Sequence, residues 1–81
     1  MSETAEEVSV KVKLIGNLRK YGDHVNEMEV ERGTRVREIV EDFDIPKDEN
    51  IMVMVNEEPK YMKYEVEEGD VIDVLRPVSG E

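Results

Sequence analysis

The stretch that decides the fold is Val8-Ser9-Val10-Lys11-Val12-Lys13-Leu14, in which apolar and polar side chains alternate. Strict alternation indicates a half-buried β-strand whose three valines and leucine face a core. After a connecting loop over residues 16–23, which has the length for one helical turn, residues 26–31 alternate again. The chain therefore predicts two consecutive strands, paired antiparallel as a hairpin.

Residues 34–44 predict one amphipathic helix. The apolar positions recur at three- and four-residue spacing, at Val36, Ile39, Val40 and Phe43. We expect Thr34 to be the N-cap, because its hydroxyl can accept a hydrogen bond from a free amide of the first turn. Pro46 is expected to end the helix, because the residue before a proline avoids helical geometry.

The second half of the chain predicts further strands. The apolar run over residues 51–55 is typical of a strand near the middle of a sheet. Asn56-Glu57-Glu58-Pro59 predicts a turn, residues 60–64 a short or irregular strand, and Glu68-Gly69-Asp70 a turn into a last strand over residues 71–75. This order predicts an α+β fold with the β-grasp (ubiquitin-like) arrangement: a mixed four- to five-stranded sheet with one main helix on one face.

The length of 81 residues allows one domain. We expect residues 1–7 to be a disordered acidic leader, residues 8–75 the β-grasp domain and residues 76–81 a flexible C-terminal tail. Pro77 supports the last boundary, because proline cannot donate a hydrogen bond to a strand ladder.

Composition excludes several classes of function. The chain has 21 acidic and 11 basic residues and a net charge of −10, which disfavours nucleic-acid binding and favours partners with basic surfaces. It has no cysteine, which excludes disulfides and thiol chemistry on a side chain. No apolar run approaches the roughly 18 residues of a membrane span. The acidic N-terminus does not resemble a signal peptide, so we expect a cytoplasmic protein that does not bind membranes.

No motif indicates that the chain is an enzyme by itself. His24 is the only histidine, which makes a metal site improbable without cysteine ligands. We interpret the acidic residues of the segment 65–70 as a solvated turn, because they lack the spacing of a calcium-binding loop. The glycines form no phosphate-binding motif. We therefore predict no catalytic residue, no bound metal and no bound cofactor.

Four segments resemble the MoaD/ThiS family of ubiquitin-like sulfur carriers, the small subunit of molybdopterin synthase and the carrier of thiamine biosynthesis. They are residues 10–22, Gly33-Thr34-Arg35-Val36-Arg37-Glu38-Ile39-Val40, Val53-Met54-Val55-Asn56-Glu57-Glu58, and Glu68-Gly69-Asp70-Val71-Ile72-Asp73-Val74-Leu75-Arg76-Pro77-Val78-Ser79-Gly80. The last of these, at the end of the chain, is the most specific.

The resemblance implies chemistry at the chain terminus. In the family, an E1-like enzyme uses ATP to adenylate the C-terminal carboxylate, and a sulfur donor then displaces AMP to leave a thiocarboxylate. A synthase subunit accepts the sulfur for molybdopterin or thiamine, or the sulfur enters a tRNA base; a ubiquitin-like modifier is a related role. Carried onto this chain, the activation tail is Val78, Ser79, Gly80 and Glu81.

The chain departs from the family at its last residue, because Gly80-Glu81 stands where the family has Gly-Gly. Four explanations remain open. Glu81 is removed before activation, activation tolerates glutamate, a terminal glycine codon has been altered, or the chain has lost carrier activity. In the last case it is a non-conjugating β-grasp binding or adaptor module.

A carrier also needs a surface that binds its partner. Alternation along the strands places Met52 and Met54 on the sheet face away from the helix, and places Leu75 beside them. Methionine-rich apolar patches often mark interfaces. We therefore predict a partner interface of Met52, Met54, Leu75, Arg76 and Pro77. The alternative is that residues 61–64 or the leader cover this patch.

Overall fold

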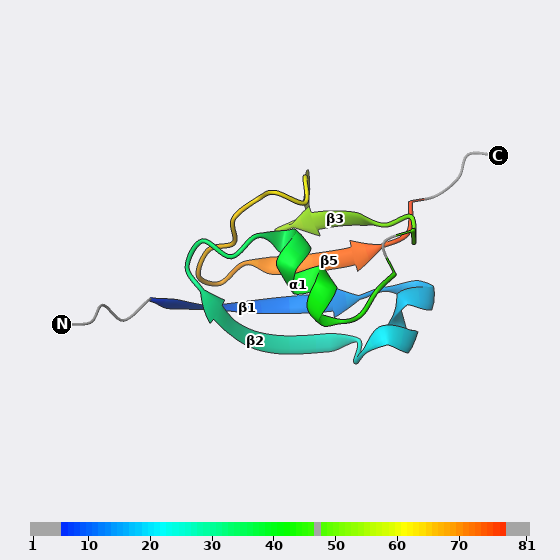
Figure 1. The fold of residues 1–81 in the computed structure, drawn as a ribbon, viewed down its shortest axis with the longest axis horizontal. Coiled ribbons are helices and arrows are strands. Elements are labelled where there is room, and N and C mark those ends of the chain that lie inside the picture. Colours follow the sequence, from blue (N-terminus) through cyan, green and yellow to red (C-terminus); the bar gives the residue numbers. More distant parts are fainter. Residues whose placement is uncertain (1–5, 47, 78–81) are drawn as a thin grey trace.

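The computed structural model describes residues 6–46 and 48–77. Within these residues the chain forms one five-stranded sheet, a short 3₁₀ helix and one α-helix (Figure 1). The elements are β1 (Glu7–Leu14), η1 (Gly16–Tyr21), β2 (Val25–Glu31), α1 (Val36–Asp42), β3 (Met52–Val55), β4 (Glu58–Lys60) and β5 (Val71–Leu75). The strand order is β2-β1-β5-β3-β4. This confirms the predicted α+β fold of β-grasp type.

The hairpin of β1 and β2 extends further toward the N-terminus than predicted. The strands pair antiparallel from Glu7 opposite Glu31 to Lys13 opposite Val25. The amide of Arg32 donates to the carbonyl of Glu6 at 2.7 Å, and its Nε lies 3.0 Å from Oε1 of Glu6. The prediction of a disordered leader was therefore wrong for Glu6 and Glu7, because these contacts hold them in the hairpin. Residues 1–5 lie outside the described part.

The last strand, β5, is the centre of the sheet. It pairs parallel with β1 and antiparallel with β3. Within the apolar run over residues 51–55, Met52–Val55 form β3, which lies one position from the centre and next to the edge strand β4. Figure 1 shows α1 crossing one face of the sheet, over β5 and β1. The helix connects the hairpin to β3, and β5 then returns between β1 and β3.

The hydrophobic core lies between α1 and the sheet. Its fully buried members include Val12, Leu14, Val36, Val55, Ile72 and Val74. Val36, Ile39 and Val40 are the buried side chains of the helix, as its periodicity predicts. Leu18 of η1 is also buried in the same cluster. Burial of these apolar side chains is the main free-energy term that fixes the helix on the sheet.

The helix begins one residue later than predicted. Arg35 is the N-cap, and the carboxylate of Glu38 accepts a hydrogen bond from the Arg35 amide at 3.3 Å. Thr34 instead belongs to the preceding turn, where its amide donates to the carbonyl of Glu31 at 3.0 Å. The predicted Thr34 cap was wrong, because Thr34 closes the turn between β2 and α1 and Arg35 takes the N-cap position. The helix ends at Asp42, and Asp44 takes a positive φ of 61°.

A tight turn joins β3 to β4. Asn56 and Glu57 both have positive φ, 53° and 72°, as a type I′ hairpin turn requires. The prediction of a four-residue turn was wrong at Glu58 and Pro59, which already belong to β4. Pro59 is tolerated there because β4 is an edge strand, where a missing N–H costs no ladder hydrogen bond.

Candidate functional site

The sheet face away from α1 carries the predicted interface residues. Along β3, Val53 and Val55 are buried against the helix side, whereas Met52 and Met54 are half-buried on the other face. Along β5, Ile72 and Val74 are buried and Leu75 is half-buried. The partly buried apolar side chains that pack against the core do not include these two methionines or Leu75. The predicted direction of these side chains is confirmed.

Strand register brings these side chains together. Met52 lies opposite Leu75, and Met54 lies between Asp73 on β5 and Pro59 on β4. We call Met52, Met54 and Leu75 the outer patch. It lies directly next to the point at which the chain leaves the sheet, because Leu75 is the last residue of β5.

The segment over residues 61–64 lies on the helix side of the sheet. Met62 and Tyr64 pack against the core cluster. The amide of Val36 donates to the carbonyl of Tyr64 at 2.9 Å, which fastens the segment to the start of α1. Because the segment is held on the helix side, residues 61–64 do not cover the outer patch.

The chain leaves β5 through Arg76 and Pro77. A guanidinium nitrogen of Arg76 lies 3.3 Å from Oε2 of Glu49, in the loop before β3. The contact is a charge pair without the alignment of a hydrogen bond. The side chain of Glu49 is 16% exposed and that of Arg76 is 49% exposed, so solvent screens the pair only in part. The predicted activation residues, Val78, Ser79, Gly80 and Glu81, lie outside the described residues.

A buried carboxylate fixes the start of β5. Asp70 is 5% exposed, and its oxygens accept hydrogen bonds from Asn56 Nδ2 at 2.9 Å, the Tyr64 hydroxyl at 3.0 Å and the Glu67 amide at 2.8 Å. Asn56 in turn accepts from the amide of Val71 at 3.0 Å. Our interpretation of the segment 65–70 as a solvated turn was therefore wrong at Asp70, which ties the β3–β4 turn to the first residue of β5.

Tyr64 is chemically perturbed by this arrangement. Its burial, its hydrogen bond to Asp70 and the negative charges of Asp70 and Glu67 raise the pKa of Tyr64 to about 12. All of these effects disfavour a phenolate. The phenol therefore serves as a neutral hydrogen-bond donor at physiological pH.

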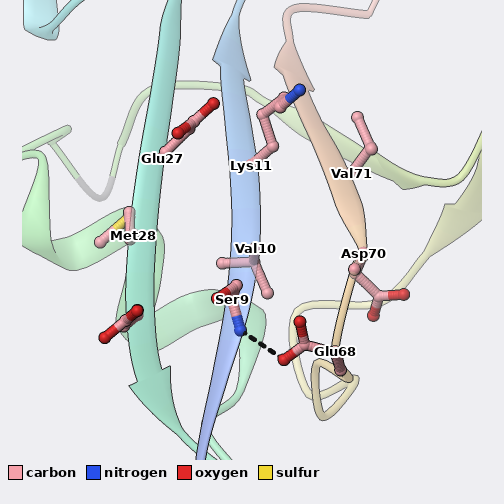
Figure 2. Close-up of a pocket in the computed structure, with 10 residues that line it drawn as sticks. Ser9, Val10, Lys11, Glu27, Met28, Glu68, Asp70 and Val71 are labelled. Carbon is pink, nitrogen blue, oxygen red and sulfur yellow. Dashed lines mark hydrogen bonds between the residues drawn. The ribbon is translucent and has the colours of Figure 1, made fainter.

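A groove of about 590 Å³ lies where β2, β1 and the start of β5 meet (Figure 2). Lys11 is in register with Glu27 on one side and Val71 on the other. At the end of the groove, the Ser9 amide donates to Oε1 of Glu68 at 2.9 Å. Glu27 and Glu68 make the groove predominantly acidic around one lysine. It offers no arrangement of a nucleophile with a base.

The described ranges, residues 6–46 and 48–77, bear on two further classes of function, metal binding and membrane insertion. In these ranges, no three histidine or carboxylate side chains gather in a way that would hold a metal ion. Neither described helix has the length and apolar character that a membrane crossing requires.

The fold and this surface define a class: small β-grasp proteins of ubiquitin type, whose last strand runs through the middle of the sheet and ends beside an apolar patch. Comparison with known proteins narrows the class. Residues 12–80 match the ThiS family. The chain belongs to the ThiS family of small ubiquitin-like sulfur carriers. No match was found among curated proteins.

Solved structures agree with this assignment. A Pyrococcus furiosus protein assigned as molybdopterin converting factor subunit 1 is 29% identical, covers 88% of this chain and 99% of its own, and has a TM-score of 0.75. The small archaeal modifier protein 1 of Haloferax volcanii shares the fold at 21% identity, covering 90% of this chain and 99% of its own, with a TM-score of 0.69. The small archaeal modifier protein 1 of Methanosarcina acetivorans shares the fold at 22% identity, covering 94% of this chain and 99% of its own, with a TM-score of 0.69.

Sequence reasoning assigned no individual role to two carboxylates, those of Asp70 and Asp73. Asp70 was interpreted together with its acidic neighbours as a solvated turn, and no role was predicted for Asp73. The signal for Asp70 was its position after Gly69 and directly before a strand, where a side-chain acceptor can satisfy turn amides. For Asp73, the signal was a charged residue between two apolar positions of an inner strand.

Proposed function

We propose that this chain is a sulfur carrier that is activated at its C-terminus. An E1-like enzyme binds the carrier and uses ATP to adenylate the terminal carboxylate, releasing pyrophosphate. A sulfur donor then displaces AMP and leaves a thiocarboxylate. A synthase subunit accepts the sulfur. In this proposal the chain itself has no catalytic residue and binds no cofactor, and it acts in the cytoplasm, where ATP is available.

The observation that carries the proposal is the position of β5 in a ThiS-family fold. The central strand ends at Leu75, inside the outer patch, and Arg76 and Pro77 continue from it. A partner that binds the outer patch therefore also contacts the start of the C-terminal tail. The active site of this partner needs to lie only a few residues further along the tail. Because the whole sequence lacks cysteine, the chain has no thiol on which to carry sulfur. This absence fits the chemistry of the family, in which the sulfur is carried on the terminal carboxylate.

One observation favours a second candidate, a non-conjugating binding module. Gly80-Glu81 replaces the family's paired glycines, and a glutamate side chain at the terminus opposes entry into a narrow channel. In this alternative the outer patch binds a partner but the terminus does not react. The two candidates share a fold and a docking surface, and they differ only in the chemistry of the terminus.

Intact mass spectrometry separates the two candidates. The purified chain is incubated with the E1-like enzyme of its own organism, ATP and sulfide, with ATP omitted as a control. The expected result is the mass increase for one oxygen replaced by sulfur. Two matched chains, one lacking Glu81 and one with Glu81→Gly, locate the effect. A gain only after Glu81 is removed indicates trimming, and no gain in any chain contradicts the carrier proposal.

The docking surface has its own test. Met54→Ala is expected to weaken binding to the same enzyme by about tenfold, because an apolar side chain at an interface core is lost. Its urea midpoint should change little, since Met54 does not pack against the core. Val25→Ala is the matched control, because Val25 is 43% exposed on the edge strand β2, far from β3 in the sheet order. A large loss of stability in Met54→Ala would instead make it a structural residue.

A further inference from the structure

One carboxylate oxygen on the outer face has no hydrogen-bond partner. Oδ1 of Asp73 is inaccessible to solvent, and within the described residues no donor bonds to it. The residue lies on the central strand β5, directly opposite Met54 of the outer patch. Its other neighbour in register is Lys13 on β1, yet the two side chains form no ion pair in the described part of the chain.

This arrangement is costly for the free protein. A buried acceptor without a partner loses its hydration and receives nothing in exchange. Asp70 shows the contrast, because the same chain satisfies that carboxylate with three donors. A strand position between Met54 and Lys13 suits a β-branched apolar residue better than aspartate. Within residues 6–46 and 48–77, the free chain therefore supplies neither a hydrogen bond to Oδ1 of Asp73 nor an ion pair with its carboxylate.

Binding supplies such a reason. An acceptor that is unsatisfied before docking gains a full charge-assisted hydrogen bond when a donor arrives. The apolar side chains around it exclude water, which strengthens the new bond. Arginine fits this position best among the cationic side chains, because its guanidinium is planar, weakly hydrated and enriched at interface hot spots. The net charge of −10 favours a cationic partner and opposes a second copy of the chain.

We infer that Asp73 is the specificity anchor of the outer patch, and that its carboxylate receives an arginine side chain of the protein that docks there. The inference rests on the proposed function, because it takes the outer patch as the docking surface. It adds the chemistry of recognition: Met52, Met54 and Leu75 supply apolar contact to many surfaces, whereas Asp73 selects those that place an arginine opposite it.

The test compares stability and binding in the same variants. Asp73→Asn and Asp73→Val remove the charge, the first conservatively and the second with a good strand former. The purified E1-like enzyme of the same organism is the probe, and its Kd is measured by calorimetry. We expect both variants to weaken binding by tenfold or more and to unfold at the same or a higher urea concentration than the wild type.

Glu29→Gln is the matched control, because it removes one negative charge from an exposed position of β2. Its Kd should change by less than about threefold at physiological salt.

The outcomes separate this inference from the proposed docking surface. If Met54→Ala binds normally, the docking surface itself is wrong and the inference falls with it. If Met54→Ala weakens binding but both Asp73 variants bind like the wild type, only the inference is overturned. Loss of stability in both Asp73 variants would also overturn it, since the carboxylate would then be structural. A wild-type dimer in sedimentation that Asp73→Asn dissociates would assign the oxygen to a second copy and reject the proposed arginine.

Discussion

Replacing Asp70 with alanine is expected to remove a large part of the stability of this domain. The carboxylate is 5% exposed and accepts hydrogen bonds from the Asn56 side chain, the Tyr64 hydroxyl and the Glu67 amide at 2.8–3.0 Å. Hydrogen bonds to a charged group contribute about 1.5–3 kcal/mol each. Asn56 and Glu67 are exposed enough to regain water, so the summed loss is smaller than three full bonds. We expect about 2–4 kcal/mol.

This expected loss is a large fraction of the total free energy of unfolding. At about 0.05–0.15 kcal/mol per residue, a chain of 81 residues has a free energy of unfolding of about 4–12 kcal/mol. Urea unfolding followed by circular dichroism measures the change. With a slope of about 1 kcal/mol/M for a small domain, the midpoint should fall by about 2–4 M at an unchanged slope.

The matched control is a neighbouring carboxylate. Glu68→Ala removes a single hydrogen bond, to the exposed amide of Ser9, and should cost less than about 1 kcal/mol. The reasoning is refuted if Asp70→Ala lies within about 1 kcal/mol of the wild type, or if it is no more destabilising than Glu68→Ala. Either result would mean that water replaces the carboxylate at the start of β5.

Two further predictions concern the same turn region. Because the pKa of Tyr64 is about 12 in the folded chain and near 10 when unfolded, its contribution to stability is complete below about pH 10 and is lost as the pH rises to about 12. Between these two pH values, the free energy of unfolding measured in urea should fall by about 1–3 kcal/mol more in the wild type than in Tyr64→Phe. Tyr61→Phe, at an 80% exposed position, should follow the wild type. Equal losses in Tyr64→Phe and the wild type would contradict the raised pKa. Glu57→Gly should raise the free energy of unfolding by about 0.5–1 kcal/mol, because glycine accepts the φ of 72° without strain, and a lower thermal midpoint would speak against the type I′ turn.

Much of the fold follows from local pattern. The alternation over residues 8–14 and the three- and four-residue spacing from Val36 to Val40 predict which side chains are buried, because the periods of strand and helix are properties of the backbone itself. The same rule correctly placed Met52 and Met54 on the face away from the helix. Local pattern was wrong where two elements compete for one residue. Thr34 has the chemistry of a helix cap, yet it closes the turn between β2 and α1.

The sequence alone determined β1, β2, β3, β5, the helix and the family, since these follow from patterns along the chain, but it misplaced the edge strand β4. Tertiary structure decided what two carboxylates do, that of Asp70 directly before β5 and that of Asp73 within it. Asp70 is satisfied because the β3–β4 turn brings Asn56 to it from 14 residues away. Within the part of the chain that the structure describes, Oδ1 of Asp73 is left without a hydrogen-bond partner, because pairing with β1 and β3 buries this oxygen and brings no donor. Whether a charge is satisfied depends on which strands lie beside it, and the strand order is set by packing of the whole domain and not by any local stretch.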